Sequence, residues 1–165
     1  MRGKLLISGI KISPVLDCIK ITVEEENFST LNQIFNTFGA KKVNIWFEVQ
    51  IKNRNNLVNV TLCIDPHNYE KVADIIRENY PNLNVCFIRS VNILSAFPYR
   101  ENPEIASLFF KTLEEKGLSV IGVSTSLSSI SCLIKHEQCL IAKESLKRAF
   151  GLQETPKPKP VKSKE

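Results

Sequence analysis

The sequence predicts an α+β protein made of two consecutive βαββαβ units. Short stretches with an apolar residue at every second position alternate with longer stretches in which apolar residues recur every three or four positions. The same order of elements then repeats after about 75 residues, so that Phe110 corresponds to Phe35. A chain of 165 residues with 43% apolar content is long and apolar enough for two small cores.

The first unit is predicted from residue 17 to residue 88. Its first strand, 17–23, is followed by a helix near 29–38 with one apolar face. The stretch "VNIWFEVQI" (43–51) alternates so strongly that one strand face is expected to carry Val43, Ile45, Phe47, Val49 and Ile51. A strand at 57–64, a helix that opens at Asp65 and ends before Pro81, and a short strand at 84–88 complete the unit.

The second unit begins with a strand at 91–96 and a helix capped by Asn102, with Pro103 in its first turn. Two strands are expected within "GLSVIGVSTSLSSISCLIK", followed by a last helix near 138–150. This unit lacks a sixth strand, whereas the N-terminus supplies an extra one at 5–12. The N-terminal strand is therefore predicted to complete the second sheet, which gives interleaved domains: 14–89, and 3–13 together with 90–151.

The charge and composition exclude several classes of protein. The net charge is +5, but the tail 152–165, predicted to be disordered, holds four lysines against two glutamates, and the remaining charge is spread without a basic run. We therefore expect no nucleic-acid partner. No apolar run is long enough for a membrane span or a signal peptide, which favours the cytoplasm and no membrane partner. The five cysteines are scattered and odd in number, which favours reduced core thiols over a disulfide frame or a metal site.

From residue 5 to residue 152 the chain resembles the tandem ACT regulatory region of aspartate kinases. The resemblance rests on "ISGIKIS", on "KVNIWFEVQ" and above all on "NPEIASLFFKTLEEKGLSVIGVSTSLSSISCLIK", with its proline-led helix, its glycine and its Ser-Thr-Ser and Ile-Ser-Cys strand ends. It implies two ferredoxin-like ACT domains, each an antiparallel sheet with helices on one face, in which the second unit borrows an N-terminal strand.

Nothing in the sequence resembles the kinase domain of those enzymes. The chain has no Walker loop, GxGxxG or HExxH motif, and its two histidines are expected at the surface or at caps. We therefore predict no catalytic residue and no cofactor. The resemblance implies a non-catalytic, amino-acid-sensing regulatory subunit of aspartate kinase, in the pathways to lysine, threonine and methionine. Two alternatives are an assembly module that has lost ligand binding and a regulator of a different amino-acid enzyme.

The resemblance also implies an amino-acid effector site, which this sequence has altered. The family has an Asp-x-Pro-Gly turn in the first unit where this chain has "ENFS", and Glu104 replaces the corresponding glycine of the second unit. On the next strand the family's asparagine and glutamine are kept, but Trp46 replaces its aspartate. We therefore predict a degenerate effector site. Its candidate residues are Glu26, Asn27, Ser29, Asn44, Trp46 and Gln50.

The serine-rich hairpin of the second unit is a candidate interface. Small hydroxyl residues there can bond the local backbone or let another chain approach closely. The interface candidates are Trp46, Ser124, Thr125 and Ser126. Tandem ACT units leave strand edges uncovered, which predicts a homodimer or larger assembly, or association with an aspartate kinase catalytic chain. An RNA-binding ferredoxin-like domain is a third class, but its aromatic central strands have no counterpart in "LVNVTLCI".

Overall fold

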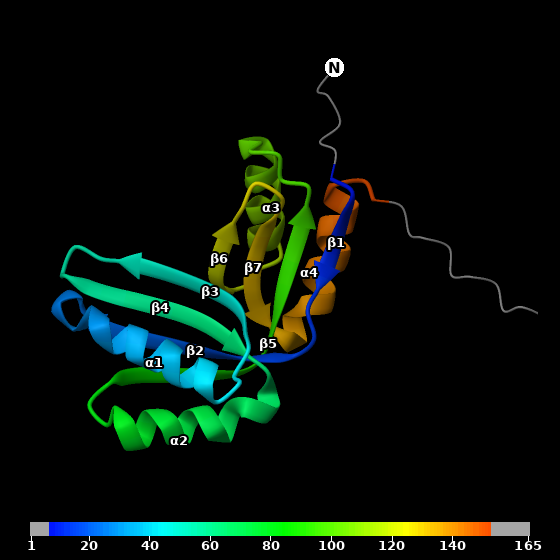
Figure 1. Cartoon of the computed structure of the whole chain (residues 1–165). Helices are drawn as coiled ribbons and strands as arrows, with labels where there is room; N and C mark the ends of the chain where they lie inside the picture. Colours follow the sequence, from blue (N-terminus) through cyan, green and yellow to red (C-terminus); the bar gives the residue numbers. More distant parts are fainter. Residues whose placement is uncertain (1–6, 153–165) are drawn as a thin grey trace, which may run out of the picture.

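The computed structural model describes residues 7–152 and has the α+β class that the sequence predicts (Figure 1). Its elements are β1 (Gly9–Ile12), β2 (Leu16–Glu24), α1 (Phe28–Ala40), β3 (Ile45–Lys52), β4 (Leu57–Ile64), α2 (Tyr69–Asn79), β5 (Asn84–Phe97), α3 (Pro103–Glu115), β6 (Val120–Thr125), β7 (Ile130–Lys135) and α4 (His136–Ala149). Short 3-10 turns precede α1 (Glu25–Asn27) and α2 (Pro66–Asn68). The predicted tail falls almost entirely outside the described residues.

Within the described residues all strands join one seven-stranded sheet of order β3-β4-β2-β5-β7-β6, with β1 paired to β5. Every pair is antiparallel. The first half of β5 borders β2 and closes a β3-β4-β2-β5 unit, and its second half lies between β7 and β1 and closes a β6-β7-β5-β1 unit. The sheet is therefore built from two ferredoxin-like units that share one long strand.

The sequence predicts two separate strands, at 84–88 and 91–96, and this is wrong. β5 is a single strand of 14 residues, and the register between β2 and β5 shifts where Leu16 and Cys18 meet Val91 and Ile88. Ser90 takes a left-handed conformation at this irregularity, with φ of 58°. A β-bulge lets a strand bend without breaking, so the chain passes from one unit to the other inside one element.

The N-terminal strand pairs in the second unit, as predicted. Gly9 lies opposite Phe97 and Ile12 opposite Leu94. The carbonyl of Phe97 also accepts a hydrogen bond of 2.7 Å from the Ser8 N–H. The first residues of the predicted strand, at 5 and 6, lie outside the described part, and the domain boundaries given above stay a prediction.

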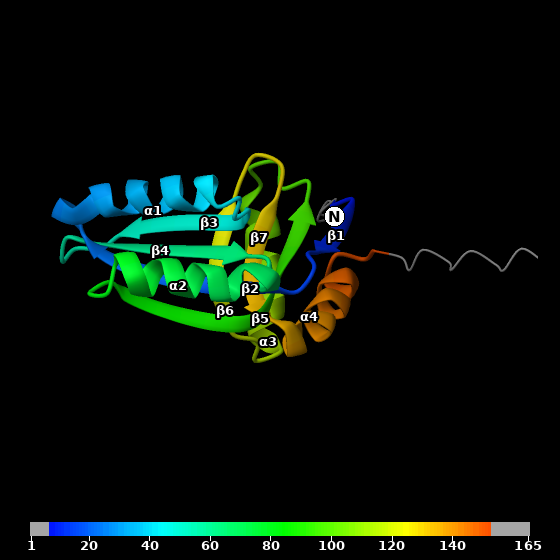
Figure 2. The same ribbon diagram turned by 60° about the horizontal axis from the view of Figure 1, so that its bottom comes forward.

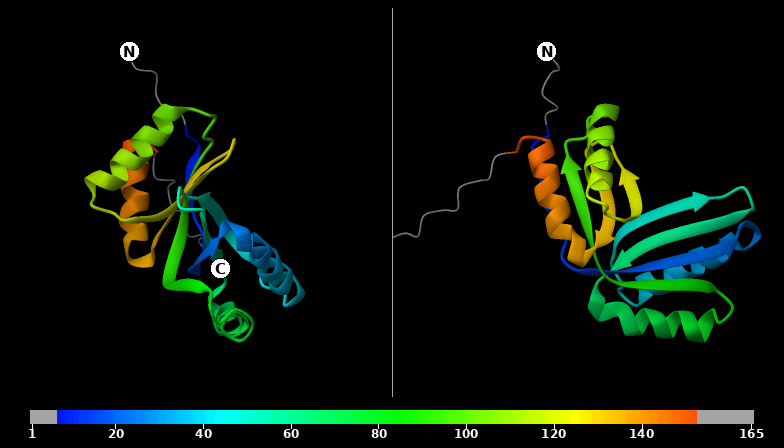
Figure 3. Two further views of the ribbon diagram at one scale, coloured as in Figure 1. Left: turned by 90° about the vertical axis from the view of Figure 1, so that its left-hand side faces the viewer. Right: turned by 180° about the vertical axis from the view of Figure 1, so that it is seen from behind.

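Each unit buries a core between its strands and its two helices. The helices α1 and α2 lie side by side along the first unit, and α3 and α4 lie beside the second (Figures 1 and 2). The two halves of the sheet meet at an angle around β5 (Figure 3). A third core fills this junction on the faces that the helices leave open: Leu16, Cys18, Phe47, Cys63, Val91 and Leu133.

The predicted apolar face of the third stretch is interrupted by a second bulge. The register of β3 against β4 shifts between Ile45 and Phe47, which leaves Trp46 as the extra residue. Ile45 consequently packs in the core between the strands and the helices of the first unit, which we call the helix-side core. Phe47 and Val49 pack in the third core at the junction of the two units, the junction core. The prediction of one continuous apolar face over 43–51 is therefore wrong.

Two further predictions concern membrane spans and cysteines. Between residues 7 and 152, no helix combines the length and the apolar character needed to cross a membrane. The five cysteines are free thiols in this part of the chain, but Cys86 is exposed, so the prediction of core thiols is wrong for that residue.

Candidate functional site

Three of the six predicted effector residues lie in two regions at opposite ends of the first unit: Glu26 and Asn27 at one end, and Trp46 at the other. Along β4, Leu57 lies opposite Glu24, at the turn that leads into α1, and Ile64 lies opposite Ile45, next to Trp46. The turn and Trp46 are therefore separated by the length of an eight-residue strand. They form two distinct candidate sites, which we call the acidic turn (24–27) and the junction pocket.

The acidic turn presents three consecutive glutamates, Glu24, Glu25 and Glu26, all exposed, at the start of α1. Its backbone is engaged internally, because the Glu25 N–H donates a hydrogen bond of 2.7 Å to the Asn56 carbonyl. A 3-10 turn therefore occupies the place where a Pro-Gly turn would leave backbone N–H groups open to a ligand.

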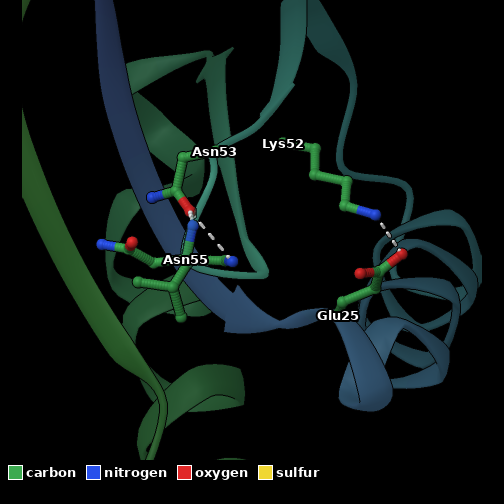
Figure 4. A network of polar contacts seen from close by, with 5 residues as sticks. Glu25, Lys52, Asn53 and Asn55 are labelled. Carbon is green, nitrogen blue, oxygen red and sulfur yellow. Dashed lines mark hydrogen bonds and ion pairs between the residues drawn. The ribbon is translucent and has the colours of Figure 1, made fainter.

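A single cation compensates this negative charge. Lys52 Nζ, at the end of β3, lies 2.5 Å from Glu25 Oε1, and both side chains are about half exposed (Figure 4). Asn53, in the hairpin that follows, holds that hairpin in place by accepting hydrogen bonds from the N–H groups of Asn55 and Leu57. The other two glutamates form no ion pair within residues 7–152, so the turn keeps a net negative charge.

A pocket of about 550 Å³ opens beside the turn, between the start of α1 and the loop that joins α2 to β5. Seven of its twelve lining residues carry a neutral amide or hydroxyl, four are apolar and one is a carboxylate: Thr22, Val23, Glu24, Asn27, Thr30, Leu57, 79–84. Asn27 thus lines this pocket, while Glu26 lines a neighbouring one. This arrangement offers hydrogen bonds to a neutral polar ligand but no cation to a carboxylate.

The other predicted effector residues lie elsewhere. Ser29 is exposed on the first turn of α1, and Asn44 is exposed just before β3. Gln50 is exposed and donates a hydrogen bond to Glu48. Since Gln50 lies opposite Val60 of the helix-side core, the bulge puts it on the face of β3 opposite to Phe47.

The junction pocket lies where the two units meet, and Trp46 forms part of its wall. It has a volume of about 420 Å³ and is lined by Lys11, Ile12, Ser13, Pro14, Trp46, Phe47, Ile93, Ser95, Ser124 and Ser131. Two predicted residues, Trp46 and Ser124, are therefore brought together here. Ser95, Ser131 and Lys11 were missed, because only the register of four strands shows that they are neighbours.

The predicted interface serines divide by role. Ser126 lies in the turn of the β6–β7 hairpin, where its Oγ accepts hydrogen bonds from the N–H groups of Ser128 and Ser129 at 3.3 and 3.2 Å. This is turn chemistry within one chain. Thr125 ends β6 and is exposed, whereas Ser124 lines the junction pocket. An interface role for these residues remains a prediction.

One buried carboxylate that sequence reasoning did not single out lies at the bend of β5. Asp17 is 2% exposed, accepts a hydrogen bond of 3.0 Å from the Ser90 N–H and pairs with Arg89 Nε at 2.8 Å. The guanidinium of Arg89 also stacks 4.0 Å from the centre of the Tyr69 ring. The sequence signals that were available are a lone acid at the start of an apolar strand and the pair "RS" just before the second unit's first predicted strand.

Comparisons with known proteins agree with the predicted resemblance. Residues 99–150 match the family model of the ACT domain. The chain is 22% identical to aspartokinase 2 of Bacillus subtilis (strain 168), covering 94% of this chain and 39% of that one, and 22% identical to an aspartokinase of Geobacillus stearothermophilus, covering 93% and 38%. It thus spans less than two fifths of the curated relatives that it matches.

Solved structures show the same fold over the whole described chain. One similar structure, of aspartokinase alpha and beta subunits, has a TM-score of 0.78 at 20% identity and covers 89% of this chain and 100% of that one. The ligand-free regulatory subunit of aspartate kinase from Thermus thermophilus has a TM-score of 0.79 at 12% identity, covering 88% and 99%. The predicted resemblance to the tandem ACT region, without a kinase domain in these 165 residues, is confirmed.

Proposed function

We propose that this chain acts as a non-catalytic regulatory module of an aspartate kinase or of a related enzyme of amino-acid biosynthesis, since residues 99–150 match the ACT domain and the fold is that of the regulatory part of aspartate kinases. The observation that carries the proposal is the near-complete overlap with a separate regulatory subunit, 88% of this chain against 99% of that one. A match over nearly the whole length of such a subunit, with both units present, supports a regulatory role for this chain.

The module is proposed to work in an assembly. The strands β3 and β6 stand at the ends of the sheet order, and their outer edges carry backbone groups without a strand partner among the described residues. Such edges pair readily with another strand, in a second copy or in a catalytic chain. Co-expression with an aspartate kinase catalytic chain, followed by light scattering, tests this. A mass near 18.7 kDa with and without the catalytic chain would contradict it.

The effector response is proposed to be weak. A ligand at about 100 times its dissociation constant stabilises a protein by about 2.7 kcal/mol, which for a chain of this size raises the melting midpoint by roughly 5 to 10 °C. The acidic turn opposes the carboxylate of an amino acid, so we expect lysine and threonine at millimolar concentration to shift the midpoint by less than about 2 °C. A larger shift would show a working amino-acid site.

A matched variant distinguishes two causes of a weak response: repulsion of the ligand carboxylate by the glutamates of the acidic turn, and complete loss of the effector site. Replacing Glu24 and Glu26 by glutamine removes two negative charges but keeps the shape of the turn and the pair between Glu25 and Lys52. If the turn is an eroded effector site, this variant should gain a measurable shift with threonine or lysine. If no shift appears, the same fold works as an assembly module without a sensor, which is the second candidate function. Pure protein should form no aspartyl phosphate in either case.

A further inference from the structure

The junction pocket carries an inference that does not depend on the proposed partner enzyme: we propose that it binds a small aromatic carboxylate. The pocket is built by both units. Trp46 and Phe47 come from β3 of the first unit, and the remaining lining residues come from the β1–β2 segment and from β5, β6 and β7. Its volume of about 420 Å³ lies in the range of small-molecule sites, which is about 300 to 1,000 Å³.

The aromatic wall results from the bulge in β3. Because Trp46 is the extra residue against β4, its side chain reaches the pocket together with Phe47, which would otherwise point to the opposite face. Phe47 is buried, whereas Trp46 keeps 49% of its surface exposed. A fixed ring beside a half-exposed indole is a suitable surface for stacking another aromatic ring.

The polar floor is a row of side chains across four strands. Ser124 of β6 lies opposite Ser131 of β7, which lies opposite Ser95 of β5, which lies opposite Lys11 of β1. Side chains directly opposite in an antiparallel sheet share a face, and all four line the pocket. The row thus places three hydroxyls and one ammonium along one wall.

These hydroxyls have hydrogen atoms to offer. Ser95 Oγ and Ser131 Oγ lie 2.7 Å apart, and in such a pair one hydroxyl donates to the other while the second keeps its hydrogen free. Ser13, by contrast, is already engaged, since its Oγ donates to the Pro14 carbonyl and accepts from the Ile93 N–H. The serine row is therefore the part of the pocket that can donate to a ligand oxygen.

The charge of the pocket selects the class of ligand. Lys11 is its one ionised side chain, and none of the described lining residues is a carboxylate. Within residues 7–152 Lys11 forms no ion pair, and its Nζ lies 5.1 Å from the centre of the Phe97 ring. A carboxylate finds a cation and hydroxyl donors here, whereas the ammonium of a free amino acid finds no anion. The fit is therefore to an aromatic acid without an amino group.

The chain provides its own reporter for the test. Trp46 is the single tryptophan of the protein, so emission excited beyond the absorption band of the three tyrosines comes from this pocket. We would titrate the full chain with phenylacetate, with acetate, which lacks the ring, and with 2-phenylethylamine, which carries the opposite charge. We expect a saturable change with phenylacetate at micromolar to millimolar concentration, and at least about tenfold weaker responses with the other two.

Two variants locate the binding. Lys11→Gln should weaken phenylacetate binding about fivefold to tenfold, because it removes a charge-assisted hydrogen bond at a partly exposed site. Ser131→Leu should fill the floor and remove saturation. Lys20→Gln is the matched control, since it removes the same charge from β2 outside the pocket, and binding should stay within about twofold.

Several results would overturn the proposal. These are no saturation by phenylacetate up to about 20 mM, an equal response to 2-phenylethylamine, or equal weakening by Lys11→Gln and Lys20→Gln. Trp46 emission that changes on dilution without responding to phenylacetate would also overturn it, because a second copy would then cover the pocket. If Ser131→Leu loses its circular dichroism signal, Lys11→Gln decides the outcome, since an exposed lysine can be replaced without loss of packing.

Discussion

Replacement of the buried Asp17 by asparagine should destabilise the protein far more than the same replacement at an exposed aspartate. Asp17 is 2% exposed and its two oxygens have two different partners at the bend of β5, the Ser90 N–H at 3.0 Å and Arg89 Nε at 2.8 Å. Asparagine keeps the volume and one acceptor. It loses the negative charge. If its Oδ1 still accepts the Ser90 N–H, its NH₂ group lies next to Arg89 Nε, and two hydrogen-bond donors then meet.

The expected loss of stability is smaller than for a fully buried ion pair, because only Asp17 of the two partners is buried. Breaking a fully buried ion pair costs about 3 to 5 kcal/mol, but the Arg89 side chain is 56% exposed and remains hydrated when its partner is lost. Asparagine also replaces the charged acceptor of the Ser90 N–H by a neutral one, and a hydrogen bond to a charged group contributes about 1.5 to 3 kcal/mol. We therefore expect Asp17→Asn to lower the free energy of unfolding by about 2 kcal/mol, which for 165 residues lowers the melting midpoint by roughly 4 to 8 °C.

The matched control is Asp74→Asn. Asp74 pairs with Arg77 on the exposed side of α2, and the two side chains are 50% and 73% exposed. Exposed pairs of this kind contribute less than about 0.5 kcal/mol. Both variants would be measured by urea unfolding and by thermal melting. Equal losses in the two variants would refute the reasoning, because they would show that burial at the bend adds nothing to the pair.

Two further predictions follow from local geometry. Asn102→Ala should cost about 1 kcal/mol in urea unfolding, since its side chain accepts the Glu104 N–H at 2.9 Å at the start of α3. Asn27→Ala is its control and should cost much less, because Asn27 occupies the same position before α1 without a capping bond; equal losses would contradict this. Cys86 should react first with a thiol reagent at pH 8, since it is exposed while burial raises the pKa of Cys132 to about 12 and leaves it protonated. A fast phase that persists in Cys86→Ser would contradict this assignment.

The regular elements could be predicted because their signals are local. The helix of the second unit is marked by Asn102 as cap, by Pro103 in its first turn and by apolar residues on one face, and the structure has α3 from Pro103 to Glu115. Counting strands was enough to predict where β1 pairs, since an unpaired sheet edge in one unit and a spare strand in the other leave one economical solution.

The two bulges could not be predicted, because a bulge depends on the partner strand. The stretch 43–51 alternates without a break in the sequence, and only the register against β4 shows that Trp46 is an extra residue. The same holds at Arg89 and Ser90, where the sequence suggests a gap between two strands and the structure has a bend within one. A one-residue shift reverses the faces of all later side chains, so errors of register become errors of site.

This is why the candidate site was predicted only in part. The turn at Glu26 and Asn27 could be located by resemblance, since it lies between a strand and a helix that were both predicted correctly. The junction pocket combines Trp46 with a serine row whose members come from three strands, and nothing in their spacing along the chain indicates that they meet. The register in which distant strands pair decides which hydroxyls face the indole, and local sequence patterns do not specify that register.

The shared strand β5 gives the two candidate sites a mechanical connection. Its first half borders β2, which leads into the acidic turn, and its second half carries Ser95 in the junction pocket. Between them lies the bend at Ser90, fixed by the buried carboxylate of Asp17. A ligand that preferred one angle between the units would shift their equilibrium by its difference in affinity for the two states, and β5 is the strand that both sites share. Asp17→Asn should therefore let the angle between the two units vary more, in addition to lowering the free energy of unfolding. A change in Trp46 emission in the folded variant would report this greater variation of the angle.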